Sequence, residues 1–470
     1  MSRTKCLRYP YPGIQRVISV ILLLAITPLA NAQNLSLPDA IKKALDNYPL
    51  ILQKKAELNA DAAHIRTVAS RKLPSFILSE QIDAGTANSM IGPYFSMGIV
   101  PSTSGAVAAS ENANTASANI ATALMQLDVY RFGYHNAERK EAEAAFATSD
   151  ARLKSQEFIL ASNITSLYFD WLKKYRLMLV LEQNRVRANT IFTSIRANVL
   201  SGLKPGVDSS TAMAESSRAY ISYLQALTAY ENDRAELAGY TGLDTGSIKP
   251  DTSVVSSAKM ARILEIAPVT VVPASHPLIE AARRELEQQQ VSNTIIAKKY
   301  LPNFSVQGAT WMRGSSIAYN DMYNSLNDGL AYSRYNYLVG VAATYNLTDL
   351  KQRHDQLAEG RYRAEAKKMS LETRQTDLDI ALQQATISYT NTLRQLRELP
   401  TLLQSANAAY TQQLTLYKAG LNTLVDVTNA LYNLQKAETD NILAQSELLQ
   451  IQYLRASLSD KQDSFFENFK

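Results

Sequence analysis

Two long stretches of helical periodicity dominate the chain. From about residue 136 to 200, apolar side chains recur at three- and four-residue steps, without Gly or Pro. At 1.5 Å per residue such a helix is a rod on the order of 100 Å long. A second rod is predicted over 349–418, where Pro400 removes one backbone donor and is expected to interrupt and kink it. Rods of this length favour a coiled-coil-like assembly over a compact core.

Each rod ends in the same kind of turn before a return helix. Glycine follows the last helical turn, at Gly202 and at Gly420, where a left-handed residue is tolerated at little cost. Six residues later stands an aspartate, Asp208 or Asp426, which is suited to cap the return helix. Return helices are predicted over about 208–238 and 426–458. The chain is therefore expected to make the same helical hairpin twice, with tips near residues 202 and 420.

Four segments alternate between apolar and polar residues and predict strands with one apolar face. They lie in two β-hairpins, 75–131 and 302–347. In the clearest run, Tyr335 to Leu347, Tyr, Val, Ala and Leu alternate with Asn, Gly and Thr. The loop of the first hairpin contains a short apolar piece, 94–100, that would lengthen the hairpin. Such alternation fits a half-buried soluble sheet or a membrane β-barrel.

Landmarks recur in the same order, which indicates one structural unit used twice. Pro49 and Pro277 open matching helical patterns, and Pro74 and Pro302 close them, 25 residues later in both cases (74−49 and 302−277). A period on the order of 220 residues is far too long for a solenoid. We therefore expect two similar halves of one molecule.

The halves are predicted to be residues 33–240 and 276–459, joined by a linker at 241–275. The first half opens with a short helix, 36–47, which Ser36 can cap. Residues 460–470 are expected to form a frayed, flexible tail in which Phe469 is incidental.

The first 32 residues have the pattern of a secretory signal. Four cations precede an apolar run, 17–26, that is too short to span a bilayer comfortably. Small residues then favour cleavage between Ala32 and Gln33, with an uncleaved anchor as the alternative. Cleavage lowers the formal net charge from +5 to +1 (5−4), so the basic balance is no evidence for nucleic-acid binding.

The sequence gives no support for catalysis or for a bound cofactor or metal. The sole cysteine, Cys6, lies in the leader, which leaves the mature chain without a thiolate nucleophile or a cysteine ligand. The histidines, at His64, His135, His276 and His354, are scattered without partners at a ligand spacing. No Gly-x-Ser-x-Gly or His-Glu-x-x-His motif is present. We predict no enzyme, no cofactor and no metal site.

Secretion, the lack of disulfides and the paired rods favour the membrane interpretation of the strands. Aromatic residues near the ends of the fourth strand, Tyr335, Tyr337 and Tyr345, fit the interfaces of a membrane barrel. No apolar run near 20 residues follows the leader, which argues against transmembrane helices. Four strands cannot close a barrel, and open edges are not tolerated in lipid. One chain would thus need partners, and three chains would supply about twelve strands.

The sequence resembles the TolC family of outer-membrane efflux and secretion channels along nearly the whole mature chain. The motifs that carry the resemblance are the opening Leu35 to Ile41, the strand entries Leu73-Pro74 and Leu301-Pro302, the junction Phe132-Gly133, and the second tip, Gly420-Leu421 with Val425-Asp426-Val427. No single motif is specific, but their order, spacing and duplication together are.

The resemblance implies a mainly α fold with β structure. It implies a homotrimer with a 12-stranded outer-membrane β-barrel, four strands from each protomer, and a long α-helical barrel in the periplasm, with an equatorial belt formed by the linker and the termini. The implied function is a passive exit duct of a tripartite efflux or type I secretion system. The implied partners are a periplasmic adaptor and an inner-membrane pump of a Gram-negative-type cell. The alternative is a periplasmic adaptor-like coiled-coil protein, which two hairpins and two strand pairs disfavour.

In that family the hairpin tips face the inner membrane and meet the adaptor. Carried over, the docking ends are Gly202, Leu203, Val207, Asp208, Gly420, Leu421, Val425 and Asp426. Leu203 and Leu421 are the residues most expected to contact the adaptor. The alternative for the glycines and aspartates is a purely structural role, in which they turn the hairpin and cap its return helix. Many members place acidic residues on the lumen face before the second tip. This chain has no acid between Glu398 and Asp426, which puts such a cation-sensitive constriction in doubt.

Overall fold

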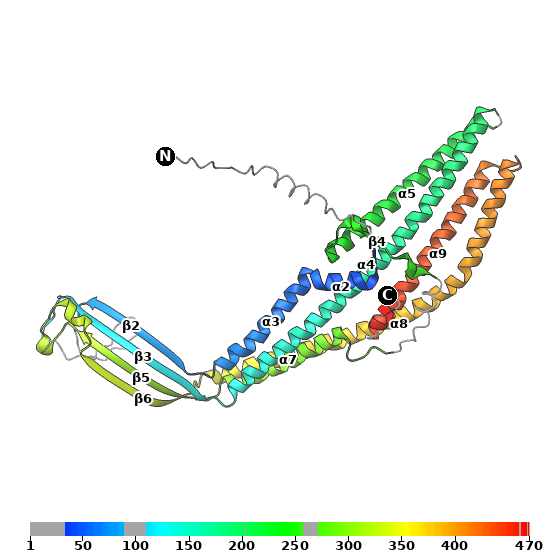
Figure 1. Ribbon diagram of the computed structural model, residues 1–470. Helices are drawn as coiled ribbons and strands as arrows, with labels where there is room; N and C mark the ends of the chain where they lie inside the picture. The colour runs from blue at the N-terminus through cyan, green and yellow to red at the C-terminus, as the bar shows by residue number, and fades with distance from the viewer. Residues whose placement is uncertain are drawn as a thin grey trace, which may run out of the picture. The chain divides into compact units, whose positions relative to one another are not determined.

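The computed structural model describes residues 33–88, 110–202, 204–256, 271–459, 462–467 and 469. The chain forms two compact units. Figure 1 colours the chain from blue at the N-terminus to red at the C-terminus. The first unit comprises Met1–Gln53, Lys154–His276 and Thr376–Lys470, and the second comprises Lys54–Leu153 and Pro277–Gln375. The predictions for the leader, for the apolar piece 94–100 and for Leu203 lie outside the described residues.

The first unit is built on two helical hairpins (Figure 1). Helix α4 (Tyr134–Leu200) turns into α5 (Gly206–Thr241), and α8 (Asp349–Lys418) turns into α9 (Leu424–Leu458). With 67 and 70 residues, α4 and α8 have the predicted length on the order of 100 Å. Helix α8 continues through Pro400, so the predicted interruption is wrong. A proline removes one helical hydrogen bond, and the bonds of the flanking turns hold the helix together.

Within the first unit, a short two-stranded sheet connects the start of the first half to the predicted linker. Strand β1 (Gln33–Leu35) pairs in parallel with β4 (Ile248–Pro250). The predicted linker therefore contributes a strand, flanked by single 3₁₀ turns η1 (Thr245–Ser247) and η2 (Thr252–Val255). Helix α2 (Leu37–Asn47) follows β1, and the Ser36 hydroxyl accepts a hydrogen bond from the Asp39 amide as the expected cap.

An aromatic core holds these pieces. Trp171 and Tyr168 are fully buried, and Trp171 stacks on Tyr230 with ring centroids 6.1 Å apart and ring planes 4° from parallel. The Tyr168 hydroxyl donates to the Leu35 carbonyl at 2.8 Å and accepts from the Asp251 amide at 3.2 Å. Burial raises the pKa of Tyr168, so the hydroxyl stays protonated and ties β1 to the segment after β4.

The C-terminal tail is folded, contrary to the expectation of a frayed end. Helix α10 (Gln462–Glu467) carries Phe465, and both Phe465 and Phe469 are almost fully buried. Their rings lie 6.2 Å and 5.7 Å from the ring of Phe169, centroid to centroid. Phe469 is therefore not incidental. The two phenylalanines are four residues apart, a spacing that places them on one side of a helical turn.

The second unit holds the sheet. Its strands are β2 (Ser75–Gly85), β3 (Ala116–Tyr130), β5 (Asn303–Ser315) and β6 (Arg334–Thr344). They form one antiparallel sheet in the order β2-β3-β5-β6, so the predicted hairpins join through β3 and β5. All four strands lie within the predicted hairpins, 75–131 and 302–347, with β3 beginning at Ala116 and β5 extending to Ser315.

Helices lead into and out of this sheet in the second unit. They are most of α3 (Pro49–Ser70), all of α7 (Pro277–Lys299) and the parts of α4 and α8 nearest the strands. Glu285 of α7 links three of them, because it accepts from Arg152 of α4 at 2.8 Å and from Lys367 of α8 at 2.6 Å. Although burial opposes the charge of Glu285, these two cations hold its pKa below the usual value.

Within the described ranges, no helix is both long enough and apolar enough to cross a lipid bilayer.

Phe465→Ala is expected to destabilise the first unit by about 3–5 kcal/mol, because it empties a fully buried aromatic site. The measurement is the apparent melting temperature of the full chain in detergent, followed by near-UV circular dichroism. Tyr362→Ala is the matched control, since Tyr362 is 73% exposed. Equal melting temperatures for Phe465→Ala and the unmodified chain would show that the tail is not docked.

Candidate functional site

The hairpin tips turn at the predicted glycines. Gly202 and Gly420 have φ of 73° and 77°, a conformation that side chains with a Cβ rarely adopt. At the second tip the Leu421 amide donates to the Leu416 carbonyl at 2.9 Å, and the Gly420 amide donates to Tyr417 at 3.0 Å. These bonds satisfy carbonyls that the end of α8 would leave free.

The predicted aspartates lie one turn inside the return helices and are not the capping residues. The residues that precede α5 and α9 are Pro205 and Thr423. Asp426 forms a reciprocal capping box with Thr423, accepting from its amide at 3.1 Å and its hydroxyl at 2.6 Å. These bonds lower the pKa of Asp426. Asp208 occupies the same position in α5 but makes a different contact, which joins the two hairpins.

That contact is with Tyr417, at the last turn of α8. Its hydroxyl donates to Asp208 Oδ2 at 3.2 Å, and the Lys204 ammonium lies 4.5 Å from its ring centroid. Burial, with help from the Asp208 charge, raises the pKa of Tyr417 to about 12. The ring packs into a cluster of buried residues from both hairpins, made of Ile195, Ala212, Tyr417, Leu424 and Val427. The tips are therefore joined by one hydrogen bond over a small apolar core.

Sequence analysis missed Tyr417, although a signal for it is present. Tyr410, Leu414 and Tyr417 follow one another at spacings of four and three residues on α8. This stripe predicts a buried face. It does not say that the face meets the other hairpin, because the partner Asp208 is 209 positions away.

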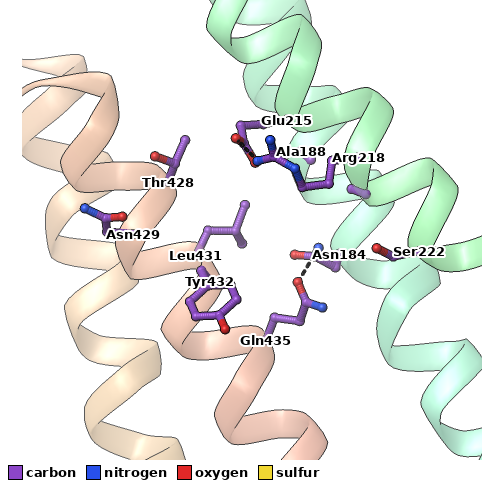
Figure 2. Close-up of a pocket in the computed structure, with 11 residues that line it drawn as sticks. Asn184, Ala188, Glu215, Arg218, Ser222, Thr428, Asn429, Leu431, Tyr432 and Gln435 are labelled. Carbon is purple, nitrogen blue, oxygen red and sulfur yellow. Dashed lines mark hydrogen bonds and ion pairs between the residues drawn. The ribbon is translucent and has the colours of Figure 1, made fainter.

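Polar contacts continue between the hairpins away from the tips. Arg187 makes two hydrogen bonds to the Glu438 carboxylate, at 2.8 and 2.9 Å. The Asn184 amide donates to Gln435 at 2.9 Å, and Arg176 donates to Gln445 at 2.7 Å. Figure 2 shows the Asn184–Gln435 pair facing a cavity of about 360 Å³ between α4, α5 and α9. The hairpins thus meet through a small core at the tip, and beyond it through these polar pairs and a second apolar cluster of Ala188, Ala219 and Leu431.

The remaining predicted tip residues differ in exposure. Val207, Leu421 and Val425 are 67%, 74% and 58% exposed. Their neighbours Leu424 and Val427 face the core between the hairpins. The tips therefore present apolar side chains to their surroundings although buried positions are available one residue away.

In the second unit, the strand register places the predicted apolar sets on one face of the sheet. Phe76 pairs with Met125, Met125 with Gly308, and Gly308 with Val339, and paired residues of antiparallel strands share a face. This apolar face holds Phe76, Leu78, Ile82, Ala121, Ala123, Met125, Leu127, Val306, Met312, Tyr335, Tyr337, Val339 and Val341. The opposite face mixes polar residues such as Gln81, Thr122, Gln126 and Arg313 with Ile77 and Leu338.

The apolar face is open and both outer strands have a free edge. Leu78, Tyr337 and Val339 are 82%, 85% and 77% exposed. Among the described residues, β2 and β6 each have a partner strand on one side only. Such a surface and such edges are unstable in water and require a cover.

Aromatic rings gather where the sheet meets the helices. The rings of Tyr130 and Phe132 lie 4.8 Å apart, and those of Phe132 and Phe304 lie 6.2 Å apart, centroid to centroid. Phe132 and Gly133 both have positive φ, 47° and 78°, which makes the sharp corner from β3 into α4. We call Tyr130, Phe132 and Phe304 the aromatic corner.

The four histidines have different surroundings. His64 and His354 are exposed, His135 lies 3.2 Å from Glu138, and His276 is buried edge-on against Phe158. Within the part of the chain that the structure describes, no group of three or more His, Cys, Asp or Glu side chains could hold a metal ion.

The model of the outer membrane efflux protein family matches residues 40–243. No curated protein matches by sequence. Among solved structures, the outer membrane protein VceC of Vibrio cholerae is 16% identical with a TM-score of 0.71, and covers 90% of this chain and 95% of its own. The CmeC outer membrane channel of Campylobacter jejuni is 14% identical with a TM-score of 0.69, over 92% and 90%. The open MtrE outer membrane channel of Neisseria gonorrhoeae is 13% identical with a TM-score of 0.67, over 93% and 94%.

At these identities the structural likeness establishes the fold, and the predicted mainly α fold with β structure is confirmed. The family match adds sequence evidence over most of the first half. Together they confirm the resemblance found in the sequence, and they support an outer-membrane location with a large periplasmic part. The matched family consists of channels and is not an enzyme family.

Tyr417→Phe removes the hydroxyl that joins the hairpin tips and leaves the ring in its core. We expect a loss of about 0.5–1.5 kcal/mol in local stability, because one intramolecular hydrogen bond is removed. The measurement is amide hydrogen exchange over residues 424–430, which should become faster. Tyr432→Phe is the control, because Tyr432 is 64% exposed. Unchanged exchange in Tyr417→Phe would mean that the hydroxyl does not hold the tips together.

Proposed function

We propose that this chain, which carries the sequence pattern of outer membrane efflux proteins and the fold of outer-membrane channels, is one protomer of a trimeric, passive exit duct. Such a duct binds no cofactor and does no chemistry. An inner-membrane pump would supply the energy through a periplasmic adaptor, in a tripartite efflux or type I secretion system.

The observation that carries the proposal is the open, apolar face of a four-stranded sheet with two unpaired edges. Apolar residues toward lipid and a more polar opposite face are the pattern of a membrane barrel. Each backbone group left unpaired in lipid costs several kcal/mol, so β2 and β6 both need partner strands. If β2 of one copy pairs with β6 of the next, three copies close a barrel of about twelve strands, which lies within the usual range.

The helical unit supplies a second argument for copies of the same chain. Exposed apolar residues follow one side of α5, at Met213, Tyr220, Ile221 and Leu224. A comparable set, Ile380, Ile387 and Leu402, is exposed on the part of α8 in the same unit. A helix with an uncovered apolar stripe is stabilised by a neighbouring helix. We assign these stripes to the seams between protomers, where α5 of one copy meets α8 of the next.

The hairpin tips are assigned to docking. Val207, Leu421 and Val425 are exposed and apolar; Leu421 lies in the turn after Gly420, and Val207 and Val425 lie in the first turns of α5 and α9. Rigid apolar residues on a prominent turn are typical anchors of a protein interface. A periplasmic adaptor is the proposed partner. The Asp208–Tyr417 hydrogen bond must break when the two hairpins separate, so it resists opening of the duct.

The adaptor-like alternative gains no support from a specific observation. Two helical hairpins disfavour an adaptor, and the four-stranded sheet with its open apolar face has no role in that alternative.

Purified full-length protein in detergent is expected to have the mass of three chains and to form ion channels in planar lipid bilayers. The channels would arise because closure of the sheet leaves a water-filled lumen. Leu78→Asp is the test variant, since it places a charge on the apolar face in the middle of β2 and should reduce insertion. Ser79→Asp on the opposite face is the control. A water-soluble monomer that never conducts would refute the proposed duct.

Adaptor docking is tested with a single cysteine at the second tip. Cys6 lies in the leader, so Leu421→Cys in the mature chain can be labelled alone with a photoactivatable cross-linker. We expect it to capture in cells a periplasmic protein that mass spectrometry identifies as a hairpin-containing adaptor. Tyr362→Cys, equally exposed but in the second unit, is the control. Capture of the same proteins from both positions would contradict docking at the tip.

A further inference from the structure

The segment between β5 and β6, residues 316–333, folds back over the sheet, and we call it the strap. Its first residue is bound at β3, because Ser316 donates to the Ser117 carbonyl at 2.9 Å and the Ser117 amide donates to the Ser316 hydroxyl at 2.8 Å. Further along, Asn119 donates from its side chain to the Leu330 carbonyl at 3.0 Å. These bonds hold the strap at both of its ends.

The side of the sheet on which the strap lies follows from the register. Ser117 and Asn119 lie four and two residues before Ala121 (121−117 and 121−119), in step with Ala121 and Ala123, so their side chains point to the apolar face. The Tyr332 hydroxyl donates to Glu80 Oε1 at 2.6 Å, and Glu80 pairs with Ala121 and shares that face. A loop that covers the lumen of a barrel would pack on the opposite face. The strap therefore lies on the outside.

Two glycines allow the backbone of the strap to approach the sheet closely. A Cβ on Gly314 would overlap the Ala331 carbonyl, and a Cβ on Gly329 would overlap Ser117. Both overlaps involve backbone atoms, which cannot move aside cheaply. The strap is thus a fixed part of the surface in this structure.

The outer surface of this fixed strap is amphipathic: it exposes four large apolar side chains among polar ones such as Asp321, Asn324 and Asp328. Tyr319 and Met322 are 88% and 62% exposed, and Leu326 and Leu330 are also exposed. They continue the exposed apolar face of the sheet beyond the polar positions Glu80 and Asn119. Large apolar side chains next to charged ones on a single loop, continuous with an exposed apolar face, fit a boundary between water and a non-aqueous neighbour.

The distance from the aromatic corner identifies that neighbour. Asn119 lies eleven residues along β3 from Tyr130 (130−119). At about 3.3 Å per residue and a tilt of about 40°, this is about 28 Å along the barrel axis. The apolar band of an outer-membrane barrel is about 25 Å tall and is bounded by aromatic residues at both interfaces. If the aromatic corner marks one boundary, the strap lies at the other.

We propose that the strap is an interfacial lipid anchor: it lies outside the barrel at the outer boundary of the membrane, with Tyr319, Met322, Leu326 and Leu330 seated among the lipids of the outer leaflet. The inference rests on the proposed function, since it requires the sheet to be in the membrane. It also means that this loop leaves the mouth of the pore uncovered.

The test measures the depth of single cysteines labelled with the fluorophore NBD in full-length protein, reconstituted in phosphatidylcholine vesicles. Met322→Cys reports on the strap, Val339→Cys on the middle of the apolar face, and Ser79→Cys on the opposite face. Lipids that carry a nitroxide at the headgroup should quench Met322→Cys severalfold more than Ser79→Cys. Lipids with a nitroxide deep in the acyl chain should quench Val339→Cys most.

The outcomes separate this inference from the proposed function. Quenching of Val339→Cys by lipid, with Met322→Cys quenched only by aqueous iodide, would overturn the anchor and leave the membrane sheet intact. Shielding of Met322→Cys from both lipid and iodide would place the strap against another copy and would also overturn the anchor. No lipid quenching at either position would overturn both proposals.

A second variant pair tests whether packing of the strap on the sheet sets its depth. Gly329→Val should displace the strap from Ser117 and lower the headgroup quenching of Met322→Cys, with Val339→Cys unchanged. Gly340→Val is the control, because nothing lies within 4 Å of a Cβ at Gly340. Equal quenching of Met322→Cys with Gly329→Val and with Gly340→Val would contradict the role of this packing.

Discussion

Backbone hydrogen bonding at the edges of the sheet is the constraint on which the rest of the molecule depends. Among the described residues, strands β2 and β6 each present a row of amide and carbonyl groups without a partner strand on one side. Water can satisfy such groups, but a lipid environment cannot, and the adjacent apolar face is unsuited to water. Pairing with further copies, as proposed above, would meet both demands. In that proposal, oligomerisation is part of how the sheet becomes stable, and the symmetry of the sheet also constrains the helices.

The contacts between the helical hairpins obey a different rule. They consist of a small core around Tyr417 and of amide and ion pairs such as Asn184–Gln435 and Arg187–Glu438. Partly exposed pairs contribute little net stability, because water competes for the same groups. A second apolar cluster, Ala188, Ala219 and Leu431, also lies between the hairpins, so their contact combines apolar packing with polar pairs. In the proposed duct, the sheet would have a permanent partner and the hairpin contact would open.

Sequence patterns predicted the elements well wherever a local rule determines them. The glycine turns at Gly202 and Gly420, the helix that starts at Pro49 and the alternation in β6 all depend on neighbouring residues, and the structure has each of them. Asp208 and Asp426 show the limit of local rules. Both were predicted as caps, but one joins a capping box and the other binds a tyrosine 209 positions away.

Features that depend on distant partners escaped sequence analysis. The folded tail was missed because the burial of Phe465 depends on Phe169, which no periodicity connects to it. The packing of the strap was not predicted, because the sequence of residues 316–333 does not reveal that Gly314 and Gly329 fit it to the sheet. The docking role of the tips remains a prediction, since a protein interface is defined by a partner as much as by the exposed residues.

The way the chain is divided between the two units has a consequence for its biogenesis. Each unit takes segments from both halves of the duplicated sequence, so neither half contains a complete core. The Trp171 region, for example, shares its unit with residues after Thr376, more than two hundred positions later. Non-local cores of this kind form slowly, and their apolar segments stay exposed until the remote segment arrives. A chain of this design has to be kept from aggregating while it emerges, and cutting it between the two predicted halves would leave neither unit complete.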